Sequence, residues 1–151
     1  MKRLPLFLLL PLVLFSANVG NAQSVSKPPL SLRNKAAIIQ LAMELKLESE
    51  GPLKFSQHLV FRAGEMSPKL LPKIPGFEIH LMKPAAIEKR TQPPEGFKFL
   101  DIAFSQKGES IGFDLYIIER RGGLPMHSHV YKYLFIKSGD MWQGKIVLII
   151  C

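Results

Sequence analysis

The sequence predicts an α+β domain in which one amphipathic helix packs on a curved antiparallel sheet of about five to six strands. Two observations carry this prediction. Apolar residues between 34 and 51 recur every three or four positions, as they do along one face of a helix. After Pro52 the period changes to two, and short glycine-bearing turns separate the later apolar runs, which is typical of neighbouring antiparallel strands. We therefore expect the helix to cover one face of the sheet.

The helix is predicted to begin at Asn34, whose side chain can cap its first turn, and to end at the Gly51–Pro52 break. A second, brief helix is predicted at 84–90, where a proline occupies the first position. Between them, residues 64–76 contain three prolines and indicate a loop or a short helical turn. Period-two alternation predicts the strands within 53–63, 76–84, 97–104, 111–120, 126–136 and 141–150.

The first 22 residues have the pattern of a secretory signal peptide. A basic start precedes an apolar run at 4–17, and small residues follow at the positions that a signal peptidase reads. The run is shorter than the roughly 20 residues that a membrane-spanning helix needs. We expect cleavage near Ala22 and a secreted or periplasmic mature chain without a transmembrane segment. It would consist of a flexible lead at 23–33 and a single α+β domain at 34–151.

The net charge indicates which partners the protein could attract, and the cysteine count indicates whether a disulfide could stabilise it. The formal net charge of +8 favours a soluble basic surface, or attraction to anionic envelope polymers or lipid headgroups. Nucleic acid is not expected, because export removes the protein from it and no recognition motif is present. Cys151 is the only cysteine, so an internal disulfide is impossible and the fold depends on packing.

Two histidines in the stretch MHSHVYKYLF are the first candidates for a metal site. On a strand they share one face about 6.5–7 Å apart, which lets both imidazoles approach one ion. A metal site needs at least a third protein ligand. His58 and His80 lie on the non-core phase of their strands, and Glu78 lies near His80. The sequence thus names His127 and His129 as metal ligands, His80, Glu78 and His58 as further candidates, and a divalent transition metal as the one cofactor to test.

Aromatic residues continue the same face of that strand. Tyr131, Tyr133 and Phe135, with Trp142 across a tight turn, could form a ligand or partner surface. The alternative is a second core face under the helix, because aromatic residues on strands are usually packed. The opposite face of the strand is the more apolar one and is the expected core side; it carries Met126, Val130, Leu134 and Ile136.

The longer stretch GGLPMHSHVYKYLFIKSGD resembles the first motif of the cupins, small β-barrels that often carry a metal. The shared positions are Gly123, Pro125, His127, His129 and Gly139. The resemblance implies that the histidine pair would be ligands. The glutamate ligand of the family would fall near Lys132 or Tyr133, and neither is acidic. The second motif of the family has no room before residue 151.

Function is the least determined property. The sequence GESIG at 108–112 matches the pattern of a serine hydrolase elbow, but no helix follows Ser110, so we do not expect a catalytic serine. We expect an exported, non-enzymatic binding or interaction module. One alternative is a metal-binding, cupin-like protein that uses His127 and His129. Another is a truncated remnant of a larger secreted protein, because the chain stops inside an apolar run at 145–151.

Overall fold

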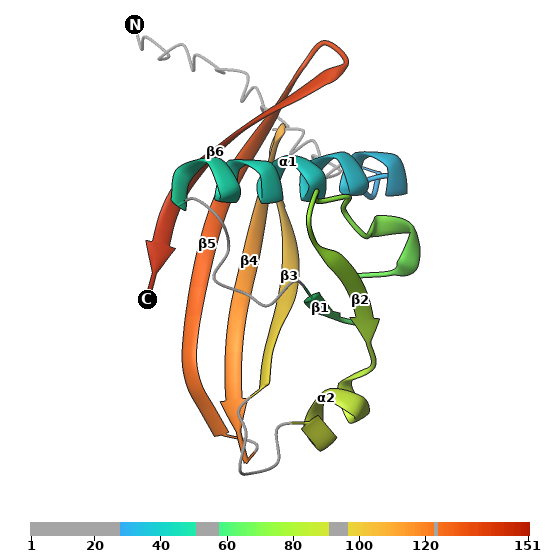
Figure 1. Ribbon diagram of the computed structural model, residues 1–151. Helices are drawn as coiled ribbons and strands as arrows, with labels where there is room; N and C mark the ends of the chain where they lie inside the picture. The colour runs from blue at the N-terminus through green and yellow to red at the C-terminus, as the bar shows by residue number, and fades with distance from the viewer. Residues whose placement is uncertain (1–27, 51–57, 91–96, 123) are drawn as a thin grey trace, which may run out of the picture.

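The computed structural model describes residues 28–50, 58–90, 97–122 and 124–151. One six-stranded sheet forms its centre, with the strand order β2-β1-β3-β4-β5-β6, and α1 crosses one face of it (Figure 1). The predicted α+β class, with one main helix on a sheet of about six strands, is therefore confirmed. The elements are α1 (Leu32–Glu50), β1 (His58–Arg62), η1 (Pro68–Leu70), β2 (Glu78–Met82), α2 (Pro84–Arg90), β3 (Phe97–Lys107), β4 (Ser110–Arg121), β5 (Leu124–Ser138) and β6 (Met141–Ile150).

Strand direction divides the sheet into two parts. Strands β3 to β6 form the antiparallel meander that the short turns predict. Strand β1 is parallel to both of its neighbours, β2 and β3, so the sheet is mixed rather than wholly antiparallel. The reason is the length of the connections: residues 63–77, which include η1, carry the chain back before β2 begins, and α2 lies between β2 and β3.

Helix α1 begins earlier than predicted, and a different residue caps it. The Asn34 backbone N–H donates to Ser31 Oγ at 3.3 Å, so Ser31 takes the capping position that the sequence analysis gave to Asn34. Gln40 joins the helix to the segment before β2: its side chain donates to the carbonyl of Lys73 at 3.0 Å and accepts from the Lys73 N–H at 2.8 Å. These two bonds hold the β1–β2 connection against α1.

The main core lies between α1 and the sheet, and on β5 it uses the aromatic face. Antiparallel register places Tyr133 opposite Phe113 and Tyr131 opposite Leu115, so these rings meet the apolar side of β4. The expectation that the opposite face of β5 is the core side was wrong; Ile136, on that face, is 52% exposed. The largest fully buried core side chains between α1 and the sheet are Tyr133, Phe61, Phe113, Phe135, Ile38, Ile39, Met43, Leu59 and Leu100.

A smaller contact involves α2 near one end of β3 and β4. Glu88 of α2 accepts from the Arg120 guanidinium at 3.1 Å, and that guanidinium lies over the Phe99 ring at 5.9 Å. Ile87 is the buried residue of this helix. Among the helices that the structure describes, none has the length and apolar character needed to cross a membrane. The predicted signal peptide at 1–22 lies outside the described residues and stays a prediction.

Candidate metal centre

The parallel pair β1–β2 brings three metal-ligating side chains to one face of the sheet. Their register pairs His58 with Glu78 and Val60 with His80. Side chains of paired residues point to the same face, and His80 is two residues beyond Glu78, so all three share that face. Leu59, which alternates with them, is fully buried on the α1 side. The backbone that carries the three ligands is therefore anchored in the core.

The donor atoms of these three side chains converge. His58 Nδ1 lies 3.1 Å from Glu78 Oε2 and 3.2 Å from His80 Nε2, and the last two atoms are 3.6 Å apart. The two imidazole centroids are 5.4 Å apart and the rings are inclined by 34°. We call this group the His58–Glu78–His80 site. In the described part of the chain it is the one group of three or more histidine, cysteine or acidic side chains with this convergence.

These separations fit a tetrahedral ion. A zinc ion with N and O ligands at about 2.0–2.1 Å keeps its ligand atoms about 3.3–3.4 Å apart. An octahedral magnesium ion with the same bond length keeps adjacent ligands only about 2.8–3.0 Å apart. The three measured separations, 3.1, 3.2 and 3.6 Å, bracket the tetrahedral value. His58, Glu78 and His80 could thus together hold one ion.

All three ligands are exposed to solvent. The exposed fractions of the side chains are 56% for His58, 70% for Glu78 and 49% for His80. A structural zinc site is normally closed by four protein ligands, whereas a site with an open position binds water or an exchangeable ligand. The His58–Glu78–His80 site therefore has the character of an accessible centre on the surface.

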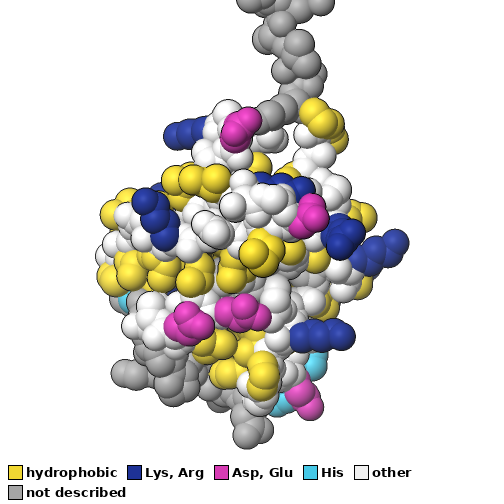
Figure 2. All heavy atoms as spheres, turned by 90° about the horizontal axis from the view of Figure 1, so that it is seen from above, with side chains coloured by type: hydrophobic (Ala, Val, Ile, Leu, Met, Phe, Trp, Pro, Cys, Tyr) yellow, Lys and Arg dark blue, Asp and Glu magenta, His cyan; other side chains and the backbone are white. Residues whose placement is uncertain are grey.

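The histidine pair of β5 does not join this site. His129 lies opposite Ile117 on the core face under α1, whereas the three ligands lie on the other face of the sheet. Strands β3 and β4 also separate β5 from β1, which is about 14 Å at the usual strand spacing. Figure 2 shows histidine side chains on opposite sides of the molecule, one group beside an acidic side chain. The side chain of His127 lies outside the part that the structure describes.

The positions where the cupins would supply a third ligand have other roles. Lys132 Nζ donates to Asp114 Oδ2 at 2.7 Å. Tyr133 is only 1% exposed and belongs to the core. Within the described chain the sheet is open, with β2 and β6 as its edges, whereas the resemblance implies a closed barrel (Figure 1). The structure therefore gives no support to a cupin-type ligand set.

The aromatic residues considered as a binding surface are mostly buried. Tyr131, Tyr133 and Phe135 are 4%, 1% and 0% exposed. This placement corresponds to the alternative of a core face under the helix. Trp142 is partly buried, and its indole N–H donates to Asn34 Oδ1 at 3.5 Å. Of the four residues, Trp142 alone is left partly accessible.

A second polar cluster lies on the outer face of β4 and β5. Asp114 accepts from Lys132 at 2.7 Å and from the Tyr116 hydroxyl at 3.3 Å. Partial burial, and then the nearby Asp114 charge, raise the pKa of Tyr116 above its usual value. The hydrogen bond to Asp114 raises the pKa of Lys132. The ion pair and the hydrogen bond join these three side chains, and the cluster has no histidine or cysteine to hold a transition metal.

The serine of GESIG has a local structural role. Ser110 Oγ donates to the Lys107 carbonyl at 2.8 Å, across the turn that joins β3 and β4. The serine hydrolase elbow joins a strand to a helix, and here the next element is a strand. Ser110 therefore stabilises a hairpin turn.

Comparison with known protein families, with curated proteins and with solved structures found no match for this chain. The basis for a functional proposal is thus the chemistry of the described residues. Attraction to anionic envelope polymers or lipid headgroups, which the net charge favours, stays a prediction, as does a role as an interaction module.

Proposed function

We propose that this protein binds a divalent transition metal ion through His58, Glu78 and His80. The observation that supports this function is the convergence of two imidazole nitrogens and one carboxylate oxygen at 3.1, 3.2 and 3.6 Å. Hydrogen bonds can also join these three atoms when one of the imidazole nitrogens carries its proton, and the titration described below distinguishes that arrangement from a metal site.

The ligand types favour zinc and its neighbours over the lighter divalent ions. Imidazole nitrogen suits zinc, copper, nickel and iron, whereas calcium and magnesium prefer sites made wholly of oxygen. Affinity at such a site is expected to rise from nickel to copper and to be lower again for zinc. Two histidines and one carboxylate also leave room for a solvent molecule on the ion.

Exposure favours reversible binding over a permanent structural role. The core between α1 and the sheet is complete without the three ligands, since their alternating neighbours Leu59 and Ile79 supply the packing. Loss of the ion should therefore leave the fold intact. We infer a protein that takes up and releases metal.

Isothermal titration of the full chain with zinc, nickel and magnesium chloride tests the proposal. We expect one zinc and one nickel ion per chain and no magnesium binding. His58→Ala, His80→Ala and Glu78→Gln should each weaken zinc binding at least tenfold, which is the effect expected for loss of one of three protein ligands. Glu65→Gln is the matched control, because Glu65 is also an exposed carboxylate and its ion-pair partner among the described residues is Lys35, at 3.5 Å.

The histidine pair of β5 provides the decisive comparison. His127→Ala should leave the zinc affinity unchanged if the His58–Glu78–His80 site binds the ion. Loss of binding in His127→Ala, with normal binding in His58→Ala, would overturn the proposal and restore the site predicted from the His-x-His pattern. Magnesium binding as tight as zinc binding would also contradict it.

A further inference from the structure

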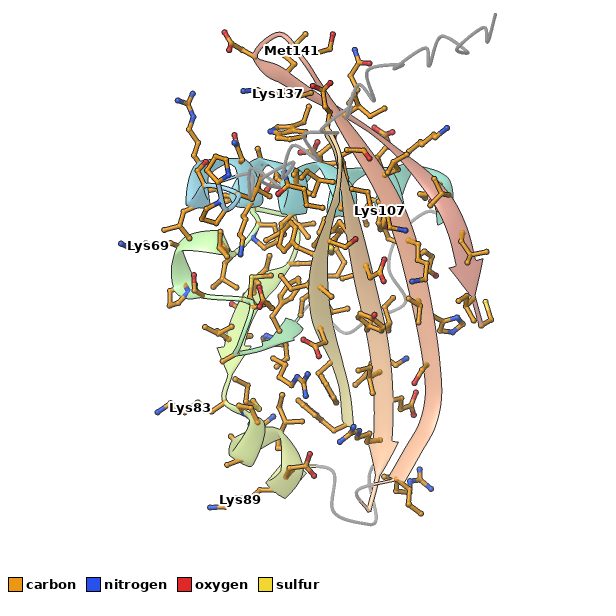
Figure 3. All side chains as sticks on the ribbon, turned by 180° about the vertical axis from the view of Figure 1, so that it is seen from behind. Lys69, Lys83, Lys89, Lys107, Lys137 and Met141 are labelled. Atoms are coloured by element: carbon orange, nitrogen blue, oxygen red, sulfur yellow. The ribbon has the colours of Figure 1, made fainter. Side chains whose placement is uncertain are left out.

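A second site lies far from the metal ligands, where the start of α1, the β3–β4 turn and the β5–β6 hairpin meet. It is a pocket of about 350 Å³, within the size range of pockets for small molecules. Figure 3 shows Lys137 and Met141 on the hairpin, which projects beyond α1. The lining residues that carry the argument are Asn34, Gln106, Glu109, Ile111, Lys137 and Trp142.

Opposite charges line this pocket without neutralising each other. Neither Glu109 nor Lys137 forms an ion pair or a side-chain hydrogen bond with any residue in the described chain. On the neighbouring part of β4 and β5, by contrast, Lys132 pairs with Asp114 at 2.7 Å. The two charges are therefore available to a ligand that carries both signs.

The remaining lining residues supply an aromatic ring, amide groups and an apolar side chain. The hydrogen bond from the Trp142 indole to Asn34 Oδ1, at 3.5 Å, sets the orientation of the ring. Gln106 offers an amide that can both donate and accept. Ile111, which is 3% exposed, adds an apolar side chain to the lining. An apolar ligand body can thus rest against the ring and Ile111 while its polar ends reach the rim.

We propose that this pocket binds a small zwitterion with an apolar side chain, of the class of free α-amino acids. Glu109 would receive the ammonium group, Lys137 the carboxylate, and Trp142 the apolar part. Hydrogen bonds to charged groups are the stronger ones and give such a ligand its orientation. The site is independent of the metal proposal, because it shares no residue with the His58–Glu78–His80 site.

Tryptophan fluorescence tests this inference directly, since Trp142 is the only tryptophan. L-leucine is the probe. The matched comparison uses 3-methylbutylamine and 4-methylpentanoate, which each keep one of the two charges, and glucose, which has none. We expect a saturable change with L-leucine and at least tenfold weaker binding of each single-charge analogue, as is usual when one charged group loses its partner.

Substitutions in the pocket test whether the fluorescence change arises from binding there. Glu109→Gln and Lys137→Gln should each weaken L-leucine binding about tenfold or more. Lys107→Gln and Asp140→Asn change charges on the same two turns without touching the pocket and should have no effect. Absence of a saturable signal, equal binding of L-leucine and its analogues, or tighter binding of glucose would each overturn the inference. Zinc titration of the same variants should be normal, which separates the two proposals.

Discussion

His129 on β5 and His80 on β2 come from strands with the same period-two alternation, yet they belong to opposite environments. His129 lies on the α1 side of the sheet, among residues that complete the core. His80 lies on the other side, 49% exposed, with two further ligands within 3.6 Å. The difference shows that alternation determines which side chains share a face. The helix and the neighbouring strands determine which face is covered, and so whether a histidine packs or faces solvent.

The largest effect is expected from truncating a ring on the covered face. Phe135→Ala should lower the free energy of unfolding by about 3–5 kcal/mol, because Phe135 is fully buried and stacks on Tyr133 with ring centroids 6.0 Å apart. His80→Ala, on the uncovered face, should change it by less than about 0.5 kcal/mol without metal. Urea denaturation measures the free energy of unfolding of both variants. Equal losses would contradict the difference between the covered and the exposed face.

The packing of β6 against the Phe135 ring gives a second test of the buried face. Gly144 lies opposite Phe135, and a β-carbon at this glycine would fall on the Phe135 ring. Gly144→Ala should therefore destabilise the protein by about 1–3 kcal/mol. A smaller side chain should relieve the clash, so the double variant Gly144→Ala with Phe135→Leu should lose less than the sum of the two single changes. Additive losses would show that the ring is not what excludes the β-carbon.

Zinc should stabilise the folded chain through the His58–Glu78–His80 site on the exposed face of the sheet. At a zinc concentration about 100 times the dissociation constant, the chain should gain about 2.7 kcal/mol of stability. His58→Ala should abolish that gain and leave the metal-free stability unchanged, as thermal melting with and without zinc would reveal. Acidification should also remove the gain, because the imidazole ligands must be deprotonated to bind. A gain that persists in His58→Ala would place the ion elsewhere.

The smallest effect is expected at the Asp114 cluster. Asp114→Asn should lower the pKa of Tyr116 toward its usual 10.0, which absorbance titration of the tyrosines measures. The pKa values of Tyr116 and Lys132 are raised in the folded state, so their contribution is present below about pH 10. It is lost as the pH rises through the folded values. The wild-type protein should thus lose more stability above about pH 10 than Asp114→Asn does. If the two proteins show the same dependence of stability on pH, Asp114 does not stabilise the fold through Tyr116 and Lys132.

Local pattern was sufficient for much of the fold. The apolar period of 34–51 predicted α1, the proline at 84 predicted α2, and the turns predicted the meander of β3 to β6. These features depend on residues that are near one another in sequence. The helix start was misplaced because both Ser31 and Asn34 can cap, and only the backbone geometry shows that Ser31 Oγ accepts the bond.

The candidate site was only partly predictable. The period-two alternation placed His58, His80 and Glu78 off the core side of their strands, which made them candidate ligands. The sequence analysis, however, added them to the histidine pair on β5 and did not predict that they form a site of their own. Their meeting depends on the parallel pairing of β1 with β2, which places His58 beside Glu78. That pairing involves residues about 20 positions apart, and no turn signal between them specifies it.

The amino-acid sequence by itself determined the class of the fold, the order of its elements and the alternation of side chains along each strand, because these follow from local periodicity and turn chemistry. The tertiary structure alone decided strand order, strand direction and the face that α1 covers, because these depend on contacts between distant segments. Those contacts bury the rings that follow His129 on β5 and leave His58, Glu78 and His80 together in solvent.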